Sequence, residues 1–268
     1  MKILFFGDVI GRSGREGVEK HLPALKDRFA PDVIIVNAEN ATSGYGLTMK
    51  MAKAFFDQGI DCITLGNHAW AQRELLTSIQ LEPRIIRPMN YPEGTPGQGF
   101  FMIKKPDGRQ ILVVQLLGQL FVQPTLDNPF ACIDRFLAAY PLSNKLQIFV
   151  DFHAEATSEK MALGQFLDGR VSAVVGSHTH VPTADAHVLS KGTAYMTDAG
   201  MCGDYDSVIG MKKEAGLWAF TQRIPYPERR APANGEASVC GVLIDTDDAT
   251  GHARTVTPVR AGGVLAPL

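Results

Sequence analysis

Imidazole and carboxamide side chains occur in this chain in two short motifs that could bind metal ions. Gly66-Asn67-His68 presents an amide and an imidazole on neighbouring residues, after a glycine that allows a tight turn. His178-Thr179-His180 contains two imidazoles, which an alternating backbone would place on the same side. A turn alone would explain Gly-Asn but not the histidine, and a surface histidine pair is the alternative for the second motif. Together the two motifs predict a metal site.

Other potential ligands follow short apolar runs in the same way. Asp8, the pair Glu39-Asn40 and His153 each come shortly after such a run. Any one of them alone could belong to a turn, a helix cap or a solvated loop. Taken together they form an oxygen and nitrogen set without thiolate, which suits Fe, Mn, Zn or Ni better than Ca, Mg or Cu(I). The predicted ligands are Asp8, Glu39, Asn40, Asn67, His153, His178 and His180.

The number of these side chains indicates how many ions they could hold. Seven ligands exceed what one ion with an open position requires, whereas two ions about 3.5–4 Å apart that share one carboxylate would use them all. We therefore expect two divalent or trivalent metal ions. We favour Fe and Mn, with Zn as the alternative. Ligand type alone does not rank these three metals.

The elements that must position these residues alternate along the chain. Short apolar runs of this kind predict strands that are buried on both faces, and amphipathic stretches between them predict helices. This order is typical of a layered α/β fold, in which the carboxyl ends of parallel strands lie at one edge. In this chain, five polar clusters would meet at that edge. The predicted strands are Ile3–Phe6, Val33–Val36, Cys62–Leu65, Ile111–Leu116, Ile148–Val150, Val171–Val175 and Ala194–Met196, and the predicted helices lie at about 14–28, 48–58, 70–79, 128–139 and 157–168.

The C-terminal part has a different character. Ala237–Asp245 and Arg254–Arg260 flank a polar turn and predict an antiparallel hairpin, which would make the sheets mixed. The stretch from Tyr91 to Gly99 is rich in proline and glycine and is expected to be a loop. No linker or charge block divides the chain, so we treat residues 1–268 as a single domain.

Composition excludes several classes of protein. The 268 residues include 26 basic and 28 acidic side chains, a balance that disfavours binding to extended duplex nucleic acid but leaves a small phosphate ester possible. The first apolar run is broken at Gly7-Asp8, too early for a signal peptide or a membrane span, so we expect a cytoplasmic protein without membrane contact. The four cysteines lie far apart and form no CxxC pair, which indicates buried thiols in a reducing compartment.

The motifs resemble those of the calcineurin-like metallophosphoesterases, in which Gly-Asn-His and His-x-His occur in the same order. Three positions depart from that pattern: Ile10 replaces the usual first-motif histidine, Glu39-Asn40 replaces the acidic bridging segment, and Ala69 follows Gly-Asn-His. These departures are typical of the YmdB-like branch. The segments similar to that branch are 7–11, 37–40, 66–70, 151–155, 176–180 and 198–211.

The resemblance implies a layered αββα sandwich with mixed sheets. It also implies two sets of ligands: Asp8, Glu39, Asn40 and His180 for one metal, and Glu39, Asn67, His153 and His178 for the other, with Glu39 as the bridge. The substrate class that it implies is a small phosphodiester, in particular a 2′,3′-cyclic nucleotide. It further suggests a homo-oligomer, although no sequence feature fixes the oligomeric state.

The expected reaction is hydrolysis of a phosphodiester by metal-activated hydroxide. His68 adjoins Asn67 but is not needed as a ligand, which suits it to act as the general acid, and the resemblance points to the same role. Arg12, in the segment Gly11–Arg15, is a candidate substrate contact, although this segment lacks a P-loop ending and could be only a capped turn. The alternatives are a phosphomonoesterase or nuclease that uses the same metals, and a regulatory protein that binds nucleotides without hydrolysing them.

Overall fold

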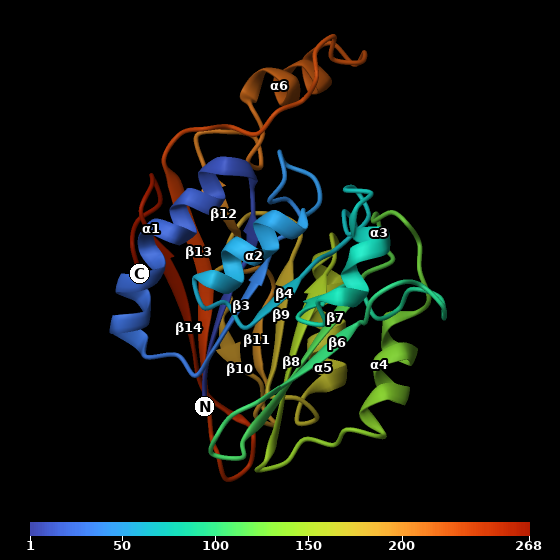
Figure 1. Cartoon of the computed structure of the whole chain (residues 1–268), viewed down its shortest axis with the longest axis vertical. Helices are drawn as coiled ribbons and strands as arrows, with labels where there is room; N and C mark the ends of the chain where they lie inside the picture. Colours follow the sequence, from blue (N-terminus) through green and yellow to red (C-terminus); the bar gives the residue numbers. More distant parts are fainter.

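The structure is a computed structural model that describes residues 1–268, and its two β-sheets pack face to face between layers of helices (Figure 1). The first sheet has the order β2-β12-β13-β1-β3-β4-β5, with β14 beside β13. Its strands are β1 (Lys2–Phe6), β2 (Asp8–Val9), β3 (Val33–Asn37), β4 (Cys62–Thr64), β5 (Ile85–Ile86), β12 (Met201–Asp204), β13 (Ala237–Thr246) and β14 (Ala253–Ala261).

The second sheet has the order β10-β11-β9-β8-β7-β6. Its strands are β6 (Phe100–Lys104), β7 (Gln110–Leu117), β8 (Leu146–His153), β9 (Ala173–Ser177), β10 (His187–Val188) and β11 (Ala194–Met196). Each sheet combines parallel and antiparallel pairs: β1 is parallel to β3 but antiparallel to β13, and β7 is parallel to β8 but antiparallel to β6. The expectation of mixed sheets is confirmed.

Helices cover the outer faces of both sheets. On the first sheet lie α1 (Gly11–Phe29), α2 (Met49–Asp57) and α3 (Leu75–Ser78), which a 3₁₀ turn, η1 (Ile79–Leu81), follows. On the second lie α4 (Pro129–Leu137) and α5 (Thr157–Leu167), whereas α6 (Lys213–Thr221) projects beyond the layers (Figure 1). The αββα layering that the resemblance implies is therefore present. None of the helices is both long and apolar enough to span a bilayer.

The apolar runs serve two cores at once, which explains why they do not alternate with polar residues. In β1, Ile3 and Phe5 pack between the sheets, while Leu4 and Phe6 pack under the helices of the first sheet. Successive side chains of a strand point to opposite faces, so a strand covered on both sides must be apolar throughout.

Several details differ from the predictions, which did not include the strands β5, β6, β10 and β12. The predicted helix at 70–79 is mostly wrong, because residues before Leu75 form turns with bonds such as Ala71 N–H to the His68 carbonyl, and only one helical turn remains. The strand predicted at Val171–Val175 begins two residues later, at Ala173. Sequence patterns also missed α6, whose large apolar side chains Leu217 and Phe220 are 59% and 82% exposed and belong to neither core.

Candidate metal centre

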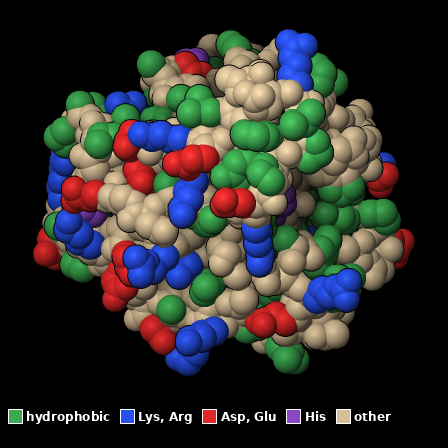
Figure 2. Space-filling model, turned by 90° about the horizontal axis from the view of Figure 1, so that it is seen from above, with side chains coloured by type: hydrophobic (Ala, Val, Ile, Leu, Met, Phe, Trp, Pro, Cys, Tyr) green, Lys and Arg blue, Asp and Glu red, His purple; other side chains and the backbone are tan.

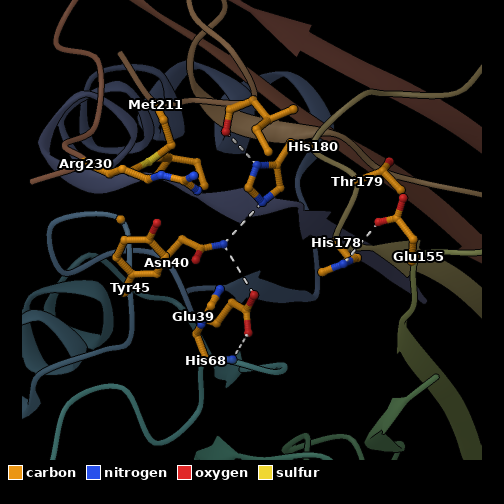
Figure 3. A pocket seen from close by; sticks show the side chains of 13 residues that line it. Glu39, Asn40, Tyr45, His68, Glu155, His178, Thr179, His180, Met211 and Arg230 are labelled. Carbon is orange, nitrogen blue, oxygen red and sulfur yellow. Dashed lines mark hydrogen bonds and ion pairs between the residues drawn. The ribbon is translucent and has the colours of Figure 1, made fainter. Parts of the chain in front are cut away.

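The polar side chains singled out in the sequence meet at the carboxyl ends of the parallel strands of both sheets (Figure 3). Five of them line a cavity of about 410 Å³: Glu39, Asn40, His68, His178 and His180. Glu39 and Asn40 follow β3, Asn67 and His68 follow β4, and His153 is the last residue of β8. Loops between strands and helices at this edge of an α/β fold are its usual ligand position.

Four of the predicted ligands converge around one point. Nε2 of His153 lies 3.0 Å from Oε1 of Glu39, 2.9 Å from Oδ1 of Asn67 and 3.0 Å from Nδ1 of His178. The ligand atoms of Glu39, His153 and His178 all lie within 4.8 Å of one another. Two imidazoles, a carboxylate and an amide oxygen at this spacing form a donor set that fits a transition-metal ion.

The remaining predicted ligands form a second group beside the first. Oδ1 of Asp8 is buried without a hydrogen-bond partner and lies 3.8 Å from Nε2 of His180. Nδ2 of Asn40 lies 3.3 Å from the same His180 nitrogen, and a flip of this amide would bring its oxygen there instead. A buried carboxylate oxygen without a partner is costly, so the geometry fits a cation at this position. The assignment of the seven residues as metal ligands stays a prediction.

Backbone groups hold the two carboxylates in place. Oδ2 of Asp8 accepts the backbone N–H of His178 at 3.0 Å, and Oε2 of Glu39 accepts that of His68 at 2.8 Å. The close approach of the backbone at position 66 to Glu39 and His153 requires glycine there. A Cβ would lie 2.4 Å from Oε2 of Glu39 and 2.5 Å from Nε2 of His153. The glycine of Gly-Asn-His thus makes room for the site itself.

A series of buried hydrogen bonds orients the imidazole of His153. Nδ1 of His153 lies 2.9 Å from the Ser177 hydroxyl, which donates to Oδ1 of Asp151 at 2.6 Å. Because that hydroxyl gives its proton to Asp151, it accepts from His153, and Nε2 is left free to bind a metal. The sequence analysis did not assign Ser177 or Asp151 a role. The available signal was spacing, since Asp151 stands two residues before His153 on the same face of β8.

The backbone of His178-Thr179-His180 differs from the prediction. His178 has φ 100° and His180 has φ 68°, so the segment is a strained turn and the expected alternating strand is wrong. Asp198 maintains the turn, because its Oδ2 accepts both the backbone N–H and the hydroxyl of Thr179, at 3.0 and 2.8 Å. Each imidazole therefore reaches a different group of ligands.

A buried lysine and a loop carbonyl complete this support. Lys160, 1% exposed, donates through Nζ to Oδ2 of Asp198 and to the carbonyl of Ser177, both at 2.7 Å. Nδ1 of His180 lies 2.8 Å from the carbonyl of Ile209, so its Nε2 faces the ligands. The two histidines are thus oriented by residues outside the motif.

The buried charges shift one another's protonation. Burial opposes the charges of Glu39 and His153, but their attraction prevails and moves the pKa of Glu39 down to about 2 and that of His153 up to about 9. Burial raises the pKa of Asp8 to about 6, against the attraction of His180 and His153. Burial and the neighbouring His153 lower the pKa of His178 to about 3, so this imidazole is neutral and able to bind a metal at neutral pH.

His68 lines the cavity beside these residues. Its ring contacts the edge of Tyr45, with centroids 5.0 Å apart, and burial lowers its pKa while Glu39 acts in the opposite direction. A phosphodiester anion in the cavity would favour the protonated imidazole. The position therefore allows proton transfer to a bound substrate.

Arg12 does not line this cavity. Its side chain is 66% exposed, lies 3.6 Å from Glu16 and borders a separate groove between α1 and α2. The arginine that lines the cavity is Arg230, which the sequence analysis missed because it stands in a proline-rich stretch without a recognisable motif. Seen from the end at which α6 projects, basic and acidic side chains are interspersed over the surface (Figure 2).

Comparisons with known proteins agree with the motifs. A family model described as YmdB-like protein matches residues 4–259. The chain is 47% identical, over 93% of its length and 93% of the relative's, to the 2′,3′-cyclic-nucleotide 2′-phosphodiesterase of Bacillus subtilis (strain 168).

Two solved structures share the fold and much of the sequence. A hypothetical protein from Thermus thermophilus is 41% identical with a TM-score of 0.89, covering 98% of this chain and 100% of that one. A structure described as a novel phosphatase from Mycoplasma pneumoniae is 34% identical with a TM-score of 0.91, covering 98% and 93%. The family prediction is confirmed, and the chain belongs to the YmdB-like family of the metallophosphoesterases.

Proposed function

We propose that this protein hydrolyses small phosphodiesters, in particular 2′,3′-cyclic nucleotides, at a site that holds two metal ions. The observation that carries the proposal is the unpartnered buried oxygen of Asp8 among the other predicted ligands, next to a cavity that His68 lines. The relatives named phosphodiesterase and phosphatase confirm the expectation of an enzyme that acts on phosphoester bonds. The name of the Bacillus subtilis relative supports the cyclic nucleotide as substrate.

The metal ions would occupy two positions in this site. Asp8, Asn40 and His180 would hold one ion, Asn67, His153 and His178 the other, and Glu39 would bridge them. When bound, Fe, Mn or Zn ions supply positive charge for the phosphate oxygens and acidity for an attacking water. Cations in the site also provide the charge that a near-neutral chain lacks for binding a phosphate ester.

The chain's own residues would position the substrate and move a proton. His68 is fixed through its backbone bond to Glu39 and its contact with Tyr45, at the wall of the cavity. From there its imidazole would donate a proton to the ribose oxygen that leaves phosphorus. The compact shape of a cyclic phosphate suits a cavity of about 410 Å³ better than a long nucleic-acid strand does.

A panel of substrates tests the proposal. Metal-loaded protein should hydrolyse 2′,3′-cyclic AMP and bis-p-nitrophenyl phosphate faster than p-nitrophenyl phosphate or RNA, and protein treated with a chelator should lose this activity. Exclusive hydrolysis of the monoester, or of RNA, would replace the proposal with the phosphatase or nuclease alternative. Tight binding of the cyclic nucleotide, returned intact after hours, would instead favour a regulatory role.

A further inference from the structure

The cavity has two chemically different sides. Tyr45, Met211 and Arg230 lie on the side away from Glu155, with the predicted metal ligands between them (Figure 3). Of the four apolar residues that line the cavity, Tyr45 and Met211 lie on that side, and Ile10 is only 2% exposed. We call this surface the apolar wall; it consists of Ile10, Tyr45, Ile209 and Met211.

Two loops in close contact build the apolar wall. A Cβ on Gly44 would lie 3.2 Å from Sδ of Met211 and 3.3 Å from Cγ of Pro232. The loop that carries Gly44 and Tyr45 therefore packs directly on the loop residues Met211 and Pro232. Val208 and Met211 exchange two backbone hydrogen bonds of 3.0 Å, which fix the second loop. The wall is therefore a formed surface next to the predicted metal ligands.

Ile209 has an unusual conformation for its residue type. Its φ is 48°, which is rare for a β-branched residue, and its side chain is 54% exposed at the cavity. Its carbonyl accepts the hydrogen bond from Nδ1 of His180, which ties this backbone to the predicted ligands. An exposed apolar side chain held at such a backbone angle suggests that a ligand covers it.

Arg230 borders the apolar wall without a partner of its own. It lines the cavity, and none of the ion pairs of the chain includes it, whereas nearby Lys213 pairs with Asp206. A planar guanidinium can stack on a nucleobase, and so can the ring of a tyrosine. A cavity of about 410 Å³ also exceeds the space that a bare phosphate group needs.

We infer that the apolar wall and Arg230 bind the base of the nucleotide whose phosphate lies over the predicted metal ligands. This inference rests on the proposed function and extends it, because it makes the nucleoside, and not only the phosphate, a recognised part of the substrate. Phosphate and base would then contact separate surfaces of one cavity.

The test compares two substrates that differ only in the base. These are 2′,3′-cyclic AMP and methyl ribofuranoside 2′,3′-cyclic phosphate, which carries the same cyclic ester without a base. The wild type should favour the nucleotide in kcat/KM by about tenfold or more, as expected for stacking of one base. Met211→Ala, Ile209→Ala and Arg230→Gln should each reduce this ratio several-fold, mainly through KM of the nucleotide.

A matched control and a binding measurement keep the outcomes separate. Met161→Ala removes a methionine that is 48% exposed on α5, outside the cavity, and should leave the ratio unchanged. A ratio near one in the wild type, or an unchanged ratio in all three cavity variants, would overturn the inference. If the wild type hydrolyses neither ester, the proposed function fails. Calorimetric titration with adenosine monophosphate then decides the inference, since weaker binding by Met211→Ala supports it and equal binding contradicts it.

Discussion

Nε2 of His153 lies 3.0 Å from Oε1 of Glu39, and both side chains are almost completely buried. Without a metal, this contact is an ion pair between a protonated imidazole and a carboxylate. A metal ion bound by the same two atoms requires the imidazole to be neutral. The pair therefore links protonation of the site to its occupancy.

Metal binding should release protons at neutral pH. The pKa of His153 is raised to about 9, so its imidazole is protonated at pH 7 and must lose about one proton per chain when Mn²⁺ binds. Calorimetric titrations in PIPES and Tris, which have different ionisation enthalpies, measure this release. In Glu39→Gln the release should shrink, because the attraction that raises the pKa is lost, and Glu236→Gln on the surface should behave like the wild type. Identical enthalpies in both buffers would contradict the prediction.

The stability of the metal-free protein should depend on pH in a defined window. The folded-state pKa of His153 lies above its usual 6.5, so its stabilising contribution is complete below pH 6.5 and is lost as pH rises through about 9. The depressed pKa of Glu39 acts at the other end, where stability is lost as pH falls from 4.5 towards about 2. The temperature at the midpoint of thermal unfolding should therefore decrease as the pH rises from 6.5 to 9. The additional stability that bound Mn²⁺ confers should increase over the same range. A metal-free midpoint that rises over this window would count against the pairing.

Replacement of His68 should separate catalysis from metal binding. His68→Ala should retain its metal but lose about 10²–10⁴-fold in kcat for 2′,3′-cyclic AMP, because the ribose oxygen needs a proton to leave. The loss should be much smaller with bis-p-nitrophenyl phosphate, since p-nitrophenolate leaves without one. His187→Ala, on the exposed strand β10, serves as the control. Loss of metal from His68→Ala would make this residue a ligand instead.

The ion pair between Lys160 and Asp198 should matter for the metal site as well as for folding. Lys160→Met would leave the carboxylate of Asp198 buried and unpaired, which costs about 3–5 kcal/mol of unfolding free energy. It would also loosen the strained turn that holds His178 and His180. When the residues that orient metal ligands are lost, metal affinity falls about 10–100-fold. Urea unfolding and Mn²⁺ titration measure the two effects.

A double variant distinguishes these two roles of the ion pair. Lys160→Met with Asp198→Asn removes the unpaired charge and should recover much of the stability, but not the metal affinity, because the turn is still poorly held. Full metal affinity in either variant would show that the ion pair serves folding alone.

Much of the fold could be predicted from the sequence because both cores depend on local patterns. Runs such as Ile3–Phe6 become strands buried on both sides, and the hairpin of β13 and β14 follows its polar turn. The helix predicted at 70–79 is mostly wrong because tertiary contacts override its periodicity before Leu75. There the side chain of Gln72 donates to the carbonyl of Tyr45 at 2.7 Å. Local periodicity carries no information about such contacts.

The convergence of the candidate site residues could be predicted from the sequence, but the residues that support them could not. Strand ends placed Asp8 and Glu39 at a common edge, whereas the turn of His178 and His180 depends on Asp198, which is distant in sequence. Arg230 lies beside the cavity because the segment from Lys212 to Ala231 returns to its starting point. The N–H of Lys212 donates to the carbonyl of Ala231 at 3.0 Å. Such long-range closures leave no periodic signal, which is why the sequence favoured Arg12 instead.

Anomalous diffraction from crystals grown with Mn²⁺ shows whether the seven predicted ligands from both sheets hold two metal ions. We predict two anomalous peaks about 3.5–4 Å apart. One peak should lie beside Asp8, Asn40 and His180, and the other beside Asn67, His153 and His178, with Glu39 within bonding distance of both. A single peak, or two peaks that do not share Glu39, would rule out two ions that Glu39 bridges.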